Sequence, residues 1–228
     1  MIMKTTKLFF CAAVMSLCSV GVFAQSKSSV IIKGGVNLAN VSNKDNGSYN
    51  DANNLTSWQA GIVGDFEVTN FFAIQPGLLY TGKGIKWQNG NSGDVGYQKL
   101  TFNPQYLELP VNLVFKTPTG GVRFFAGAGP YVAMGIGGKF KGDGVVDFSK
   151  SIEWSDDNPL TSEEEGAGVF RAKRFDYGLN ALIGIEASNL VISANYGLGL
   201  AKIQSTANSS SDDNNKHRVL SFTVGYKF

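Results

Sequence analysis

The sequence predicts an all-β fold, namely a closed, eight-stranded, antiparallel up-and-down transmembrane β-barrel. Apolar residues recur at every second position in eight segments, which is the period of a β-strand. The connections between these segments alternate between short turns and long polar loops. Charged residues fall on the face of each segment opposite to the apolar row. This last pattern predicts a polar interior and an apolar outside, as in a barrel whose surroundings are lipid.

The last segment shows the alternation most clearly. Leu220, Phe222, Val224, Tyr226 and Phe228 form an apolar row, and the residues between them are mostly small or polar. One face of this strand therefore meets apolar surroundings and the other does not. The row ends on an aromatic residue at the chain terminus, which resembles the C-terminal assembly signal of bacterial outer-membrane barrels. That resemblance implies contact with the barrel-assembly machinery through Phe222, Val224, Tyr226 and Phe228.

Seven earlier segments repeat the alternation, and each is placed by its own apolar row. The first three strands are expected within 30–40, 57–68 and 71–83, with rows from Val30 to Leu38, from Trp58 to Val68 and from Phe72 to Tyr80. The next two are expected within 105–116 and 122–135, with rows from Leu107 to Phe115 and from Val122 to Met134. The last two of the seven are expected within 174–187 and 190–200, with rows from Phe175 to Ile185 and from Leu190 to Leu200. Short turns are expected at 69–70, 117–121 and 188–189, and long polar loops at 41–56, 84–104, 136–173 and 201–216. Aromatic residues near both ends of the rows predict two belts at the depth of the lipid headgroups.

The charges indicate which face lies inside. A lipid-facing Arg or Lys at the bilayer midplane costs about 2–4 kcal/mol, so charges on one face predict a structural network in the interior. Its expected members are Lys33, Asp65, Glu67, Lys83, Glu108, Lys116, Arg123, Arg174, Asp176, Glu186 and Lys227. The interior of an eight-stranded barrel is just wide enough for side chains to fill it. This favours a plug, which means a set of paired, hydrogen-bonded interior side chains that fill and stabilise the barrel. The alternative is a ring of charges that gives an open pore its ion selectivity.

The first 24 residues predict a secretory signal peptide, cleaved after Ala24. Lys4 and Lys7 form a basic start, an apolar stretch follows, and Val22-Phe23-Ala24 supplies small residues at the cleavage site. Residues 25–228 are then the barrel domain, directed to the cell outer membrane. Both cysteines lie in the predicted signal peptide, so the mature chain would hold no thiol. Without Lys4 and Lys7 the chain has 18 basic and 18 acidic residues, which gives no reason to expect nucleic acid as a partner.

Three motifs carry a family resemblance. Residues 74–81 (IQPGLLYT), 106–110 (YLELP) and 127–131 (GAGPY) occur in this order before the terminal strand. Together they resemble the small outer-membrane β-barrel domain proteins of Bacteroidetes, labelled porin-family or PorT-like, over roughly 30–228. The resemblance implies the barrel and says almost nothing about activity.

The prolines and glycines of these motifs carry structural expectations of their own. Pro76, Pro110 and Pro130 each remove a ladder donor, so we expect local bulges there. The glycines of the motifs, Gly77, Gly127 and Gly129, are expected to point into a narrow interior.

Candidate chemistry in the sequence is sparse. His217, the only histidine, starts the last strand near the outside surface, where a lipid-modifying enzyme could use it. Ser221 lies four residues away, ~13 Å along a strand, so the two cannot form a dyad. The acidic clusters at 156–157, 163–165 and 212–213 lack the spaced ligands of a calcium loop. The Gly-rich stretches lack the Lys and Ser/Thr that follow the glycines in a phosphate-binding loop. We therefore expect no catalytic residue, no metal site and no cofactor.

The sequence as a whole predicts a non-enzymatic outer-membrane barrel with a structural or interaction role. Its expected partners are outer-membrane lipid, the barrel-assembly machinery, and a protein or small-solute ligand at the outer loops, especially 136–173. A narrow porin-like channel for small solutes is the alternative, and a lipid-modifying enzyme centred on His217 is a third reading.

Overall fold

The computed structural model describes residues 28–42, 44–45, 48–49, 54–118, 120–144, 147–154, 171–203 and 216–228. The predicted signal peptide and the three acidic clusters lie outside these residues. Across the described ranges there is no helix with the length and apolarity needed to cross a membrane.

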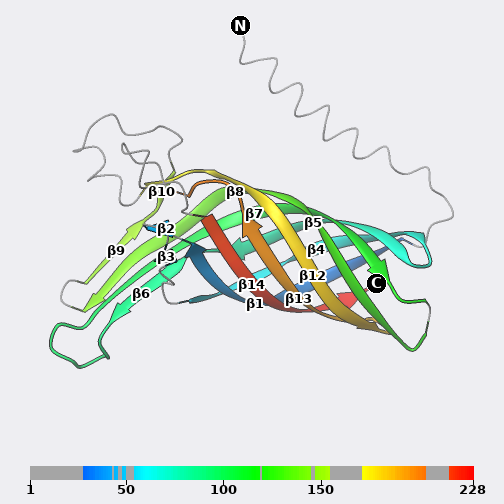
Figure 1. Ribbon diagram of the computed structural model, residues 1–228, viewed down its shortest axis with the longest axis horizontal. Coiled ribbons are helices and arrows are strands. Elements are labelled where there is room, and N and C mark those ends of the chain that lie inside the picture. Colours follow the sequence, from blue (N-terminus) through cyan, green and yellow to red (C-terminus); the bar gives the residue numbers. More distant parts are fainter. Residues whose placement is uncertain are drawn as a thin grey trace, which may run out of the picture.

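Eight of the described strands pair into a closed antiparallel ring (Figure 1). In ring order they are β1 (Ser28–Ser42), β4 (Leu55–Thr69), β5 (Phe72–Gly82), β7 (Gln98–Lys116), β8 (Val122–Gly144), β12 (Phe175–Ala187), β13 (Leu190–Gly199) and β14 (Lys216–Lys227). Each of these eight strands pairs with the one before it and the one after it in this order, and β1 pairs with β14 to close the ring. This confirms the predicted eight-stranded, up-and-down β-barrel.

The barrel wall is built from strands that alternate between exposed apolar and buried polar residues. Phe124 and Ile183 on the outside are 62% and 64% exposed, whereas Asp65 on the inside is fully buried. Aromatic side chains pack against one another on the outer surface near both ends. The Trp58 and Tyr80 rings stack at 4.8 Å, and the Phe72 and Phe115 rings lie 5.2 Å apart.

The predicted bulges at the prolines are wrong. Pro76, Pro110 and Pro130 each keep their pairing with one neighbouring strand, and the ladder to the other neighbour only skips the pairs at the proline. The register is the same on both sides of each gap, because the missing donor costs a hydrogen bond without adding a residue. The register shifts lie elsewhere, at 67–69 and at 105–106.

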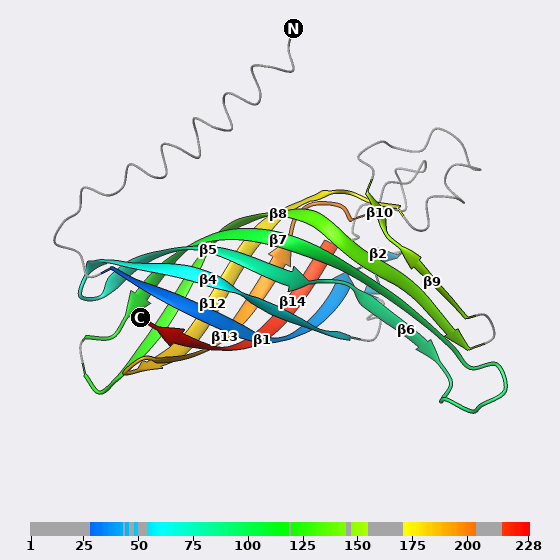
Figure 2. The same cartoon turned by 180° about the vertical axis from the view of Figure 1, so that it is seen from behind.

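The structure also corrects two of the predicted loops. Strands β7 and β8 run on past the barrel, into the ranges 84–104 and 136–173 that were predicted to be loops. There β6 (Ile85–Asn89) pairs with β7, and β9 (Phe148–Ser151) pairs with β8. These four segments form a sheet outside the ring, which we call the outer sheet: β6, residues 98–105, residues 137–144 and β9 (Figure 2).

Short strands accompany the outer sheet at the same end of the barrel. The pair β2 (Lys44–Asp45) and β3 (Ser48–Tyr49) lies in the connection from β1 to β4. The pair β10 (Glu153–Trp154) and β11 (Arg171–Ala172) lies between β9 and β12. The short turns and the C-terminus lie at the opposite end, where the Phe228 N–H donates to the carbonyl of Val30. The two ends of the barrel therefore differ as the sequence predicted.

Candidate functional site

The interior of the barrel is filled by layers of side chains that follow one another along the strands. On β4, for example, Gln59, Val63 and Asp65 point inward in succession from the outer end towards the short turns. Asp65 belongs to a charged cluster, Val63 to an apolar layer and Gln59 to the wall of a cavity. Because every second residue points inward, Val63 lies two residues above Asp65, and Gln59 lies four residues above Val63.

The charged layer nearest the short turns centres on Asp65, and we call it the turn-end cluster. Asp65 Oδ2 lies 2.5 Å from Lys116 Nζ and 2.7 Å from Lys227 Nζ. The Gln75 side-chain amide donates to the other oxygen at 3.0 Å. The two lysines also reach Glu67 and Glu186, with Lys227 Nζ 2.7 Å from Glu186 Oε1. Asp65 therefore has both oxygens bonded while fully buried.

Arg123 completes the turn-end cluster and ties it to two turns. Its guanidinium donates to Glu67 at 2.6 Å and to the carbonyl of Asn70, in the turn between β4 and β5, at 2.9 Å. Its Nε donates to the carbonyl of Thr117, in the turn between β7 and β8. The cluster holds three carboxylates and three cations, so its formal charge is balanced. Buried charges of this kind are tolerated only when they are paired and hydrogen-bonded.

Three carboxylates of this cluster lie close enough to suggest a metal site. One oxygen from each of Asp65, Glu67 and Glu186 falls within 4.8 Å of the others. However, the ammonium groups of Lys116 and Lys227 each contact all three carboxylates. The lysines thus supply the positive charge that a metal ion would bring, and the arrangement works as an ion-pair network.

An apolar layer lies directly above the turn-end cluster. Seven of the eight ring strands each contribute one buried side chain to it, and the residues are Ile31, Val63, Leu79, Val114, Phe125, Leu182 and Val191. The eighth strand, β14, places Gly225 against Ile31 at this level. These seven apolar side chains help to fill the narrow interior between the turn-end cluster and the outer half of the barrel.

A second charged cluster, the loop-end cluster, lies towards the outer end. Lys83 Nζ is 2.8 Å from Glu108 and 2.9 Å from Asp176, and it stands 4.1 Å from the centre of the Tyr131 ring. The Tyr131 hydroxyl donates to Asp176 at 3.1 Å, and the Asn180 amide donates to Glu108 at 3.2 Å. This cluster has one lysine for two carboxylates, so its described charges do not balance by themselves.

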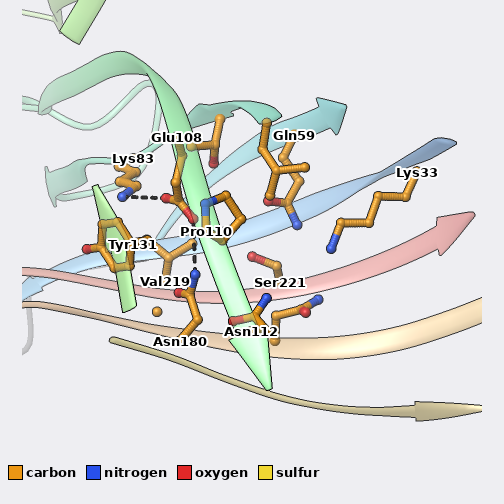
Figure 3. Close-up of a pocket in the computed structure, with 14 residues that line it drawn as sticks. Lys33, Gln59, Lys83, Glu108, Pro110, Asn112, Tyr131, Asn180, Val219 and Ser221 are labelled. Carbon is orange, nitrogen blue, oxygen red and sulfur yellow. Dashed lines mark hydrogen bonds and ion pairs between the residues drawn. The ribbon is translucent and has the colours of Figure 1, made fainter. Parts of the chain in front are cut away.

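Between the loop-end cluster and the apolar layer lies a small cavity (Figure 3). Lys33, Gln59, Asn112 and Ser221 line it, with Glu108 above them. It encloses about 30 Å³ for the centres of water molecules, which is room for about two waters. Lys33 lines the same cavity as Glu108 and is a second basic side chain in the outer half of the interior.

The structure places the predicted interior residues as follows. Asp65, Glu67, Lys116, Arg123, Glu186 and Lys227 meet in the turn-end cluster, Lys83, Glu108 and Asp176 meet in the loop-end cluster, and Lys33 lines the cavity. Arg174 does not belong with them. It precedes β12, outside the strand, and is exposed, so its prediction as an interior residue is wrong. Arg174 shares the parity of the inward Asp176, but it precedes the strand and its side chain is turned out of the interior.

His217 lies at the start of β14, at the outer end of the barrel, as predicted. Its side chain is 1% exposed and points inward, which the prediction did not address. Its Nε2 lies 3.3 Å from the Tyr106 hydroxyl, and the two rings pack edge to face at 5.5 Å. His217 has the same parity as Ser221, which lies on the inward face of β14, so the phase of the strand could have shown its direction.

Uncharged polar residues that the sequence analysis missed complete both clusters. Gln75 bonds Asp65, Tyr131 bonds Asp176 and Asn180 bonds Glu108. All three lie in the inward phase of their strands. Their parity was therefore a usable signal, although parity alone could not have shown which carboxylate each one meets.

Comparison with solved structures finds several small outer-membrane proteins at low identity. Ail, the attachment invasion locus protein of Yersinia pestis, solved in complex with the heparin analogue sucrose octasulfate, is 16% identical with a TM-score of 0.43, over 89% of this chain and 99% of that one. Neisserial surface protein A is 11% identical with a TM-score of 0.44, over 88% and 97% of the two chains. OprG from Pseudomonas aeruginosa is 15% identical with a TM-score of 0.43, over 88% and 95%. No curated protein matches the chain at a significant level.

The family described as outer membrane protein beta-barrel domain matches residues 23–205. The match takes in seven of the eight strands of the ring and most of the interior clusters. It agrees with the closed ring, with the apolar outer surface and with the charged interior. The chain belongs to the outer membrane protein β-barrel domain family and is a protein of the cell outer membrane.

Proposed function

We propose that this chain is a non-enzymatic outer-membrane barrel whose interior is a plug and whose outer sheet is an interaction surface. The outer sheet is the observation that carries the proposal. Strands β7 and β8 continue past the ring and recruit β6 and β9, which gives a paired, ordered platform beyond the barrel mouth. A binding surface on paired strands holds its side chains in place better than one on a loop.

The filled interior supports a plug over the alternative, a narrow porin-like channel. The apolar layer occupies the interior between the two charged clusters. In both clusters the cations bond to carboxylates instead of pointing at an open pore. Filling by side chains is also the geometric default for eight strands.

Burial of His217 argues against the third reading, a lipid-modifying enzyme. A catalytic base must come within hydrogen-bond reach of the atom it acts on. His217 is enclosed and contacts Tyr106, so lipid outside the barrel cannot reach its ring. Its contacts are those of a packed interior side chain.

The finer identity of the chain rests on sequence patterns. We propose membership of the PorT-like, porin-family proteins of Bacteroidetes, from the motifs at 74–81, 106–110 and 127–131. Cleavage after Ala24 and export through the assembly machinery, guided by Phe222, Val224, Tyr226 and Phe228, complete the proposal. Three of these side chains lie exposed on the outer surface of β14, and Phe228 lies exposed directly after it, where another protein can contact them.

Trimming the outer sheet tests the interaction role. Ile85 pairs with Phe102, and Phe140 pairs with Lys150. An Asn-Gly turn can therefore replace residues 86–101, and a second one can replace 141–149, without breaking the remaining ladder. Cells that display the wild-type chain are expected to bind at least one member of a panel of immobilised glycans and extracellular matrix proteins. The trimmed variant is expected to lose that binding.

The trimmed variant must still form its barrel for the result to count. Faster gel migration before boiling than after it would show the folded barrel in both proteins. Replacement of Ser188-Asn189 by Asn-Gly at the opposite end, between the paired Ala187 and Leu190, is the matched control and should leave binding intact. Unchanged binding by the trimmed variant would contradict the proposed role of the outer sheet.

A further inference from the structure

The outward surface of β8 changes from apolar to basic where the strand leaves the barrel. Val132, Met134 and Ile136 lie outward and are 40–57% exposed. Beyond them Lys139 and Lys141 are exposed on the same side. A bulge separates the two stretches, because residues 136–137 together oppose Gln105. Because the bulge adds one residue, the odd-numbered Lys139 and Lys141 lie on the same side of the strand as the even-numbered apolar row.

Neighbouring strands extend this basic surface. Thr101 on β7 pairs with Lys141 on one side and with Lys86 on the other, so all three share one face of the outer sheet. Lys99, on the same face, already pairs with Asp143 at 3.5 Å. Lys86, Lys139 and Lys141 have no acidic partner among the residues that the structure describes. We call these three residues the basic face.

The opposite face of the outer sheet is turned towards the barrel mouth. Ile85 and Phe102 form one cross-strand row there, and they pack with Val41 and Ile203 above the barrel. The next residue in the row, Phe140, is 6% exposed. One face of the sheet thus packs over the barrel mouth, and the basic face is turned away from it, to the same side as the outward apolar row of β8.

The position of the basic face along β8 matches the depth of lipid headgroups. Residues 136–137 oppose Gln105 and Lys139 opposes Asn103, two residues further along the ladder, which is ~7 Å along a strand. A strand tilted by about 45° rises ~5 Å over that length, about the thickness of one headgroup layer. Long lysine side chains extend their ammonium groups to such a polar layer from an apolar surface.

We propose that Lys86, Lys139 and Lys141 bind the phosphate groups of anionic lipids in the outer leaflet and so hold the outer sheet against the membrane. An ammonium group and a phosphate oxygen form a charge-assisted hydrogen bond. The continuity of the basic face with the lipid-facing row favours phosphate carried by lipid over a soluble polyanion. The proposal needs only the membrane-spanning barrel, so it can fail without affecting the proposed function.

Lysine labelling in nanodiscs tests this directly. The wild-type chain is placed in discs of phosphatidylcholine, alone or mixed with phosphatidic acid, and acetylation of each lysine is followed by mass spectrometry. Lys86, Lys139 and Lys141 are expected to react about fivefold more slowly in the anionic discs. Salt at about 0.5 M should restore most of the reactivity, because it screens exposed charges.

Lys150 is the matched control within the same protein. It pairs with Phe140, so it lies at the level of the basic face but on the other side of the sheet. Its labelling should respond equally to the lower surface pH of an anionic bilayer, and any extra protection belongs to the basic face. In a Lys139→Gln/Lys141→Gln variant the protection of Lys86 should fall, whereas Lys150→Gln should leave it unchanged.

Two further arms separate the sources of the anion. Inorganic phosphate, or soluble heparin, is added to discs of phosphatidylcholine alone. Little protection in these arms, beside clear protection by phosphatidic acid, supports the proposal. Equal labelling in the two kinds of disc, equal protection of Lys150, or protection by heparin or free phosphate that matches the lipid, would overturn it.

Discussion

Asp65→Asn is expected to lower the free energy of unfolding by about 3–5 kcal/mol, the cost of removing one partner from a buried ion-pair cluster. Asp65 is fully buried and bonds Lys116, Lys227 and Gln75. Asn keeps the size of the side chain but leaves the turn-end cluster with an uncompensated positive charge. Urea unfolding of the protein in lipid vesicles, followed by tryptophan fluorescence, measures the change.

Two controls separate the cluster from a general loss of packing. Adding Lys116→Met to Asp65→Asn restores the charge balance, and most of the lost stability should return because an apolar replacement of a buried pair is well tolerated. Lys99→Gln breaks a pair whose side chains are 34% and 53% exposed, and it should cost less than about 1 kcal/mol. A double variant as unstable as Asp65→Asn would contradict the role given to charge balance.

Phe222→Arg is expected to destabilise the barrel by at least about 2–4 kcal/mol, the cost of a lipid-facing arginine near the bilayer midplane. Phe222 is 49% exposed on the outer surface. It lies four residues from Arg218 at the outer end of β14 and four residues from Tyr226 at the short-turn end. It therefore lies in the middle of the membrane-spanning row, and the same unfolding measurement in vesicles reports the change.

A second arginine variant, placed near the membrane interface instead of the midplane, is the control for Phe222→Arg. Leu200 is also outward and 42% exposed, but it follows the end of β13 at the outer rim. Leu200→Arg should cost only about 0–1 kcal/mol, because the penalty falls to almost nothing at the interface. Equal losses for the two variants would mean that β14 does not cross the membrane as described.

Much of the barrel follows from the period of two. Apolar rows such as the one from Leu220 to Phe228 fixed the strands, and the parity of Asp65 and Lys116 was enough to place both inside. Side-chain direction in a strand is set by parity alone, so it can be read from the sequence. The same logic covers His217, whose inward phase outweighs its place near the end of the strand.

The outer sheet could not be predicted from the same pattern. The bulge at 136–137 shifts the phase of β8, so the alternation on its two sides does not join into one row. Past the bulge the outward residues are lysines instead of apolar residues, and Lys139 and Lys141 look like part of a solvated loop. Only pairing with β7 and β9 shows that they lie on a strand.

The partners within the clusters also lay beyond the sequence. Residues far apart in the chain meet across the barrel, as Asp65 and Lys227 do at 2.7 Å. Which inward charges meet depends on how far the strands are staggered around the ring. The period of two and the parity of a residue do not determine this offset between strands. They therefore predict that the interior charges form a network, but they do not predict which charges are in contact.

Single-channel recording in planar lipid bilayers tests the central claim, that the barrel interior is closed by its own side chains. The purified wild-type chain, with its barrel verified by gel mobility, is predicted to insert without producing steady conductance steps. The reason is that the apolar layer from Ile31 to Val191 and the two charged clusters fill the interior with packed and ion-paired side chains. Reproducible, steady conductance steps from the wild-type protein would contradict the plug and favour the channel.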